Sequence, residues 1–188
     1  MAISTRTTGY AVTAEDWNEL VNALNNNAKY DITHFFAPPT DVSSAGIETV
    51  NSAIGTPAPA WTNVLFDAGT VETMKYVFIV PGGYSSAAKI EFAFYGTATS
   101  GSVVFQSAIV GLGAEQGTNC NFGTAVLGTY AVPGTAGIRK LGTITYTDTN
   151  GVSAGDKAML YLQRVATATA DNAGGDCKVD KVMFCYEN

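Results

Sequence analysis

The acidic side chains are the groups of this sequence that could do chemistry, because other catalytic groups are scarce. A nucleophilic hydrolase needs a base beside its nucleophile, and the usual base, histidine, occurs only once, as His34 next to Phe35-Phe36. We expect His34 to be a packed or interface residue. Two carboxylates at a fixed separation can cleave a glycosidic bond. The candidates are Glu91, Glu115, Asp156 and Asp176. No motif distinguishes them, so we expect acids in solvent or in turns and no enzyme activity.

A second acidic stretch offers oxygen ligands for a cation. Asp171-Asn172-Ala173-Gly174-Gly175-Asp176 could suit calcium, but it lacks the full EF-hand pattern, and a turn is the favoured interpretation. Arg164 precedes it in a strand pattern, where an unpaired charge would be costly. We expect Arg164 to pair with Asp171 or Asp176. The sequence has no GxSxG, HExxH or P-loop motif, and we expect no catalytic residue, no cofactor and no metal.

Aromatic side chains near predicted loops could stack on sugars. Trp61, Tyr84 and Tyr130 are the candidates, although packing in the core or at an interface is the favoured use of each.

Composition narrows the possible partners. The chain has 188 residues and a formal net charge of −6, which argues against a nucleic-acid surface. No apolar run approaches the roughly 18 residues of a membrane span, so we expect a soluble protein without a membrane partner. Three cysteines, Cys120, Cys177 and Cys185, lack a CxxC spacing and indicate free thiols and assembly in a reducing compartment.

From Trp61 onward, short β-rich runs alternate with Gly, Pro, Asn and Asp. Apolar and polar residues alternate most clearly in residues 89–94 and 178–186, where Val182, Phe184 and Tyr186 share a face. This pattern predicts a mainly β fold, an antiparallel jelly-roll β-sandwich. The expected strands are 61–66, 73–80, 87–95, 102–110, 124–131, 138–147, 157–166 and 177–187.

The first 60 residues have a different pattern. Residues 1–11 indicate an extended arm, and residues 12–27 predict a short α-helix with Thr13 as its N-cap. Its apolar stripe packs either on the chain's own β domain or on the same helix of sister chains. Residues 28–37 could form a strand or a helical turn, and residues 38–60 read as a linker in which 47–54 could form a short helix or strand. We therefore divide the chain into an arm, helix and linker (1–60) and a β-sandwich domain (61–188).

Several of these segments together resemble a known family. The segment 12–24, the strand with Leu160, Leu162 and Arg164, the Gly175-Asp176 loop, and the strand with Val182, Phe184 and Tyr186 look like jelly-roll virion proteins of tailed bacteriophages. That family includes capsid decoration or cement proteins and head- or tail-fibre modules, commonly homotrimers. The resemblance implies no catalytic residue.

The resemblance yields two functional expectations. The first is a homotrimeric cement protein that binds the major capsid protein on the outside of the virion, assembled in the bacterial cytoplasm, and stabilises the head. The alternative is a receptor-binding head- or tail-fibre domain that recognises a host surface glycan. A third functional class, which does not come from the resemblance, is a polysaccharide-degrading enzyme with paired carboxylates in a cleft. The oligomer or capsid interface is expected to include residues of the arm and the helix stripe. These are Ile3, Arg6, Tyr10, Trp17, Leu20, Val21 and Leu24.

Overall fold

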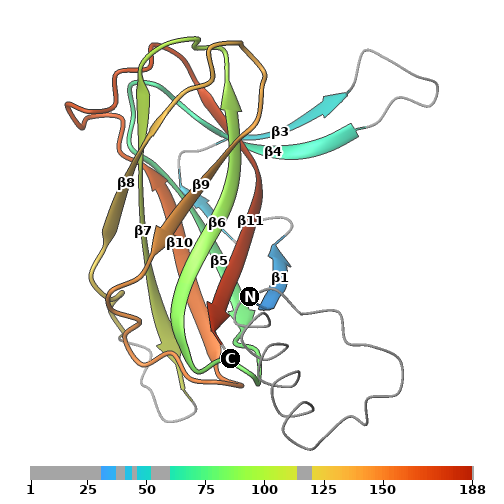
Figure 1. The fold of residues 1–188 in the computed structure, drawn as a ribbon, viewed down its shortest axis with the longest axis vertical. Helices are drawn as coiled ribbons and strands as arrows, with labels where there is room; N and C mark the ends of the chain where they lie inside the picture. Colours follow the sequence, from blue (N-terminus) through green and yellow to red (C-terminus); the bar gives the residue numbers. More distant parts are fainter. Residues whose placement is uncertain (1–30, 37–40, 44–45, 52–59, 114–119, 188) are drawn as a thin grey trace, which may run out of the picture.

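The protein is a β-sandwich of two antiparallel sheets (Figure 1). The computed structural model describes residues 31–36, 41–43, 46–51, 60–113 and 120–187, and the side chains of 62–113 and 120–186. Sheet A contains β3 (Gly46–Asn51), β4 (Ala60–Phe66), β11 (Cys177–Glu187), β6 (Ser86–Gly96) and β9 (Lys140–Thr145) in this order, with β1 (Asp31–Phe36) also paired to β11. Sheet B contains β2 (Asp41–Ser43), β5 (Glu72–Ile79), β10 (Lys157–Arg164), β7 (Ser102–Leu112) and β8 (Val126–Ala131).

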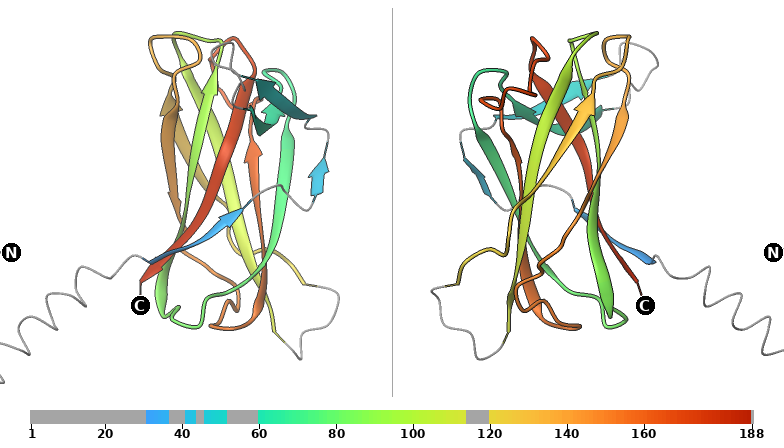
Figure 2. Two further views of the ribbon diagram at one scale, coloured as in Figure 1. Left: turned by 90° about the vertical axis from the view of Figure 1, so that its right-hand side faces the viewer. Right: turned by 60° about the vertical axis from the view of Figure 1, so that its left-hand side comes forward.

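The eight strands from β4 to β11 pair as one folded and rolled hairpin. β7 pairs with β8, β6 with β9, β5 with β10, and β4 with β11, so each pair is enclosed by the next. Successive pairs belong to opposite sheets, and the two sheets lie against each other along the long axis of the molecule (Figure 2). This nested order is the jelly-roll topology.

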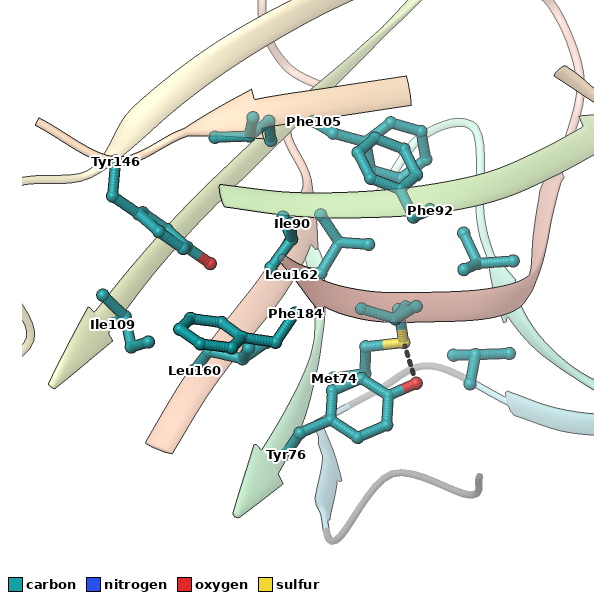
Figure 3. Packing of buried hydrophobic residues seen from close by; sticks show 14 of the residues in the cluster. Met74, Tyr76, Ile90, Phe92, Phe105, Ile109, Tyr146, Leu160, Leu162 and Phe184 are labelled. Carbon is teal, nitrogen blue, oxygen red and sulfur yellow. Dashed lines mark hydrogen bonds between the residues drawn. The ribbon is translucent and has the colours of Figure 1, made fainter. Parts of the chain in front are cut away.

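The core lies between the sheets because every long strand alternates inward and outward residues. Aromatic rings from both layers interlock there. Phe105 of sheet B meets Phe92 of sheet A with ring centroids 4.9 Å apart, and Phe78 meets Phe184 at 5.0 Å. Figure 3 shows Phe92 and Phe105 among the buried residues, and the contact of the Tyr76 hydroxyl with the Met74 sulfur.

The predicted antiparallel β-sandwich is confirmed, and each of the eight predicted strands overlaps one strand of the structure. At 31–36 and 46–51, where the sequence left helix or strand open, the chain forms β1 and β3. β2 and β3 come from the predicted linker, and β1, β2 and β3 pair with β11, β5 and β4, respectively. The division at residue 60 stays a prediction. The predicted arm and short N-terminal α-helix lie outside the described residues.

Candidate functional site

Strand β10 presents a mixed aromatic and polar surface on the side of sheet B that faces away from the core. Ala158, Leu160 and Leu162 are buried in the core, so Met159, Tyr161 and Gln163 point outward and are half-buried. We call the outward-pointing residues of β5, β10 and β7, together with Phe122, the outer face of sheet B.

The register aligns polar neighbours across this outer face. Gln163 lies opposite Thr73 on β5 and Gln106 on β7. Its amide Nε2 donates to the Thr73 hydroxyl at 2.8 Å. Gln106 in turn forms a hydrogen bond to the hydroxyl of Tyr161, while partial burial raises the pKa of that tyrosine. These bonds hold two amides, a hydroxyl and a phenol in fixed orientations on one surface.

An aromatic ring from outside the strands completes the face. Phe122 contacts the ring of Tyr161 edge to face, with centroids 4.9 Å apart and planes at 88°. The segment carrying it is bonded to β7, where Gly123 N–H donates to the Ile109 carbonyl at 2.9 Å. Tyr161 lies opposite Ala108 on β7. Ala108 is fully buried although it points away from the core.

Asp148 accepts hydrogen bonds that anchor the segment carrying Phe122. One of its carboxylate oxygens accepts the Thr124 N–H at 3.0 Å, and the other accepts the Asn150 N–H at 2.9 Å. These bonds lower the pKa of Asp148 below its ordinary value because they favour the charged form. Asn150 also donates its side-chain amide to the Asn121 carbonyl. Residues 121–124 and 148–150 thus form one bonded unit at the end of the sandwich.

The three described acids among those considered for catalysis, Glu91, Asp156 and Asp176, do not form a pair. Glu91 forms an ion pair with Lys89 at 2.9 Å on sheet A. Asp156 lies directly before Lys157, the first residue of β10. Asp176 follows Gly175, whose carbonyl accepts a hydrogen bond from Arg164, the last residue of β10. The two acids therefore lie at opposite ends of the sandwich. Glu115 lies outside the described residues. No two of the described candidates face each other across a common site.

The predicted pairing of Arg164 with Asp171 is confirmed. Arg164 is fully buried, and its Nη2 lies 2.8 Å from Asp171 Oδ1 while its Nε donates to Oδ2 at 3.1 Å. Asp171 Oδ2 also accepts the Val104 N–H, and Arg164 donates to the Gly175 carbonyl. Protein donors therefore take the Asp171 oxygens that calcium would need. Across the described parts of the chain, no three metal-ligating side chains gather into a cation site.

The aromatic residues proposed from sequence for sugar stacking serve packing where they are described. Tyr130 packs on Phe92 at 5.4 Å and donates its hydroxyl to the Thr143 carbonyl at 2.6 Å. Tyr84 packs on Tyr186 at 5.9 Å. The side chain of Trp61 is not among those described. The packing interpretation of both tyrosines is confirmed, and the aromatic pair on the outer face of sheet B is instead the half-buried Tyr161 and Phe122.

Sequence reasoning missed Tyr161 and Gln163, although a signal was present. The resemblance singled out Leu160, Leu162 and Arg164 on β10, and the residues between them necessarily point the other way. A tyrosine and a glutamine on the outward side of a strand with an apolar inner face were that signal.

The residues expected at an oligomer or capsid interface lie outside the described residues. This holds for the whole set of Ile3, Arg6, Tyr10, Trp17, Leu20, Val21 and Leu24. His34 lies in β1 opposite Phe184, but its side chain is not described. Cys120, Cys177 and Cys185 are free thiols, as predicted. In the described ranges, no helix has the length and hydropathy to span a membrane.

No family model matches the sequence, and no curated protein matches it. Solved structures with a similar arrangement include the family 11 carbohydrate-binding module from Clostridium thermocellum, in complex with a mixed-linked tetrasaccharide. It is 11% identical with a TM-score of 0.45, and the match covers 83% of this chain and 95% of that one. The CBM22-2 xylan-binding domain from Paenibacillus barcinonensis is 12% identical with a TM-score of 0.43, covering 86% and 94%.

A third similar structure is the enzymatically active domain of tailspike protein 4 from bacteriophage CBA120. It is 12% identical with a TM-score of 0.41, and 86% of this chain spans only 20% of that protein. At such scores these structures assign no family. The chemistry of the outer face of sheet B must be judged from its own residues.

Proposed function

We propose that this chain is a non-catalytic domain that binds glycans on the outer face of sheet B. The observation that carries the proposal is the aromatic pair of Tyr161 and Phe122, bordered by hydrogen-bonding side chains on neighbouring strands. A pyranose ring has an apolar face of C–H groups and a rim of hydroxyls. It therefore suits a surface where aromatic area lies beside a few fixed polar groups.

The polar groups beside the rings have the chemistry that hydroxyls require. Amides and hydroxyls both donate and accept hydrogen bonds, so Gln106, Gln163 and Thr73 can match a sugar hydroxyl in either role. The bond from Gln163 to Thr73 and the bond from Gln106 to Tyr161 restrict these side chains before a ligand arrives. Such preorganisation reduces the entropy lost on binding. A neutral saccharide is the ligand class that this set favours.

This proposal corresponds to the alternative that the sequence left open, a fibre-type domain that recognises a host surface glycan. We extend it to a homotrimeric virion component, a setting that still rests on the sequence resemblance. The capsid-cement function likewise stays a prediction from sequence, because its contact residues lie outside the described ones. No contact of the described residues favours it over glycan binding.

A glycan array tests the proposal directly. The unmodified protein, Tyr161→Ala and Leu141→Ala would be probed in parallel. Leu141 is the control because it is 63% exposed and lies on sheet A, away from the proposed face. We expect the unmodified protein and Leu141→Ala to bind the same saccharides. Tyr161→Ala should bind them at least tenfold more weakly, since a central aromatic contact is typically worth about 2 kcal/mol. Equal binding by Tyr161→Ala, or no binding by any form, would overturn the proposal.

A further inference from the structure

A separate polar cluster lies on the outward side of sheet A. Asn63 of β4, Tyr95 of β6 and Asp180 of β11 come from three adjacent strands, and Arg139 precedes β9. Asn63 is 1% exposed and the Asp180 side chain 5%, so both are more buried than outward-pointing residues usually are. Arg139 is 57% exposed and forms an ion pair with Asp180, which places it between the cluster and solvent.

Two buried polar atoms of this cluster have no hydrogen-bond partner among the described residues. They are Nδ2 of Asn63 and Oδ1 of Asp180. A buried polar atom left unpaired costs about 1–3 kcal/mol, and native structures contain few of them. Two in one cluster therefore indicate a group that satisfies both.

The backbone places the residues of the two atoms beside each other on neighbouring strands. β4 and β11 are paired as far as Val64 and Val179, and Asn63 and Asp180 are the next residues of the two strands beyond this last pair. The register between β11 and β6 shifts between Val179 and Lys181, so Asp180 is the extra residue of a β-bulge, a feature that redirects a side chain.

Neighbouring residues bond to one polar atom of each side chain, Asn63 Oδ1 and Asp180 Oδ2, and leave the other atom unpaired. The Tyr95 hydroxyl donates to Asn63 Oδ1 at 2.8 Å, which leaves the amide Nδ2 as the unused end of that side chain. Arg139 pairs with Oδ2 of Asp180, which leaves Oδ1. One atom is a donor and the other an acceptor, so a single oxygen that both accepts and donates can bond to the two.

We propose that Asn63 Nδ2 and Asp180 Oδ1 form a subsite for one hydroxyl oxygen on the outer side of sheet A. The oxygen accepts from the amide and donates its hydrogen to the carboxylate. Two sources share this chemistry, a bound water and a hydroxyl of a saccharide that enters beside Arg139. The subsite does not rest on the proposed function of sheet B, and the variants that test one leave the other untouched.

High-resolution crystal structures would test the subsite. Crystals would be grown and frozen without polyols, and a second set soaked in glucose. We expect one oxygen within about 3 Å of both atoms. A glucose hydroxyl at that point after soaking would support the subsite with a saccharide as its source, and a water retained in both crystals would support it with water as the source. The absence of an oxygen there in both crystals would overturn the proposal.

A pair of variants gives an independent readout. Asn63→Leu keeps a side chain of similar size but removes the amide, so the oxygen should disappear from the map. Leu65→Ala, at the next outward position of β4, should retain it. An oxygen still bonded to Asp180 at the same point in Asn63→Leu would contradict the bridging role of Asn63. If Asn63→Leu does not fold, the maps of the unmodified protein still decide the question.

Discussion

The inner and outer sides of strand β10 have opposite chemistry within one run of eight residues. The inner side, Ala158, Leu160, Leu162 and Arg164, is fully buried. The outer side carries Met159, Tyr161 and Gln163 at intermediate exposure. Because successive strand residues point to opposite faces, stability and recognition are assigned to alternate positions. Substitutions on the inner side should change folding, and substitutions on the outer side should change binding.

The largest effect is expected at the inner end of β10. Arg164→Met would leave the buried Asp171 carboxylate without its cation, and the free energy of unfolding should fall by about 3–5 kcal/mol. Chemical denaturation followed by circular dichroism measures this change. The double variant Arg164→Met/Asp171→Asn should recover part of the loss, since no unpaired charge remains. A single variant as stable as the unmodified protein would contradict the structural role of the pair.

The next effect is expected at Phe122, which belongs to the outer face. Phe122→Ala removes the ring that stands edge-on to Tyr161, and the affinity for a glycan ligand should fall by about 1 kcal/mol, or roughly fivefold. Isothermal titration calorimetry gives the two dissociation constants. Phe122→Tyr keeps the ring and serves as the control. An unchanged affinity in Phe122→Ala would show that Phe122 does not contribute to glycan binding.

A smaller effect is expected at Gln163. Gln163→Ala removes one amide from the outer face, and the affinity should fall by about 0.5–1 kcal/mol, or roughly threefold. The melting temperature should hardly change, because Gln163 lies outside the core. Calorimetry and thermal melting on the same sample separate the two quantities. A large drop in melting temperature with unchanged affinity would contradict this account, because it would show that Gln163 on the outer side contributes to stability and not to binding.

The smallest effect concerns pH and Asp148. Hydrogen bonds lower the pKa of Asp148 in the folded state, so its contribution to stability is present above the ordinary aspartate pKa. That contribution is lost as the pH falls through the lowered folded value. Between about pH 5 and pH 2 the melting temperature of the unmodified protein should therefore fall more than that of Asp148→Asn. Parallel pH profiles would refute the contribution of Asp148.

Alternation along the chain is local, and so the sequence predicted the strands of the sandwich well. A strand as short as β2, with three residues, is too short to show an alternation of apolar and polar residues. It is recognised only by its pairing with β5. Pairing of Arg164 with Asp171 was predictable because a buried charge needs a nearby counter-ion.

The outer face of sheet B could not be predicted as a unit. Gln163 and Thr73 meet although 90 residues separate them, and the ring of Phe122 contacts that of Tyr161 although the two residues are far apart in the chain. These contacts depend on the order of strands in the sheet. The local pattern of β10 indicates only that Tyr161 and Gln163 point away from the core.

The most direct test of glycan binding on sheet B is a nuclear magnetic resonance titration with a saccharide selected on the array. Backbone amide shifts would be followed as the ligand is added. We predict that the largest changes fall on Thr73, Gln106, Phe122, Tyr161 and Gln163, with little change at Leu141. Changes confined to sheet A, or to the end of the sandwich that holds Arg164 and Asp171, would contradict the assignment of glycan binding to this face.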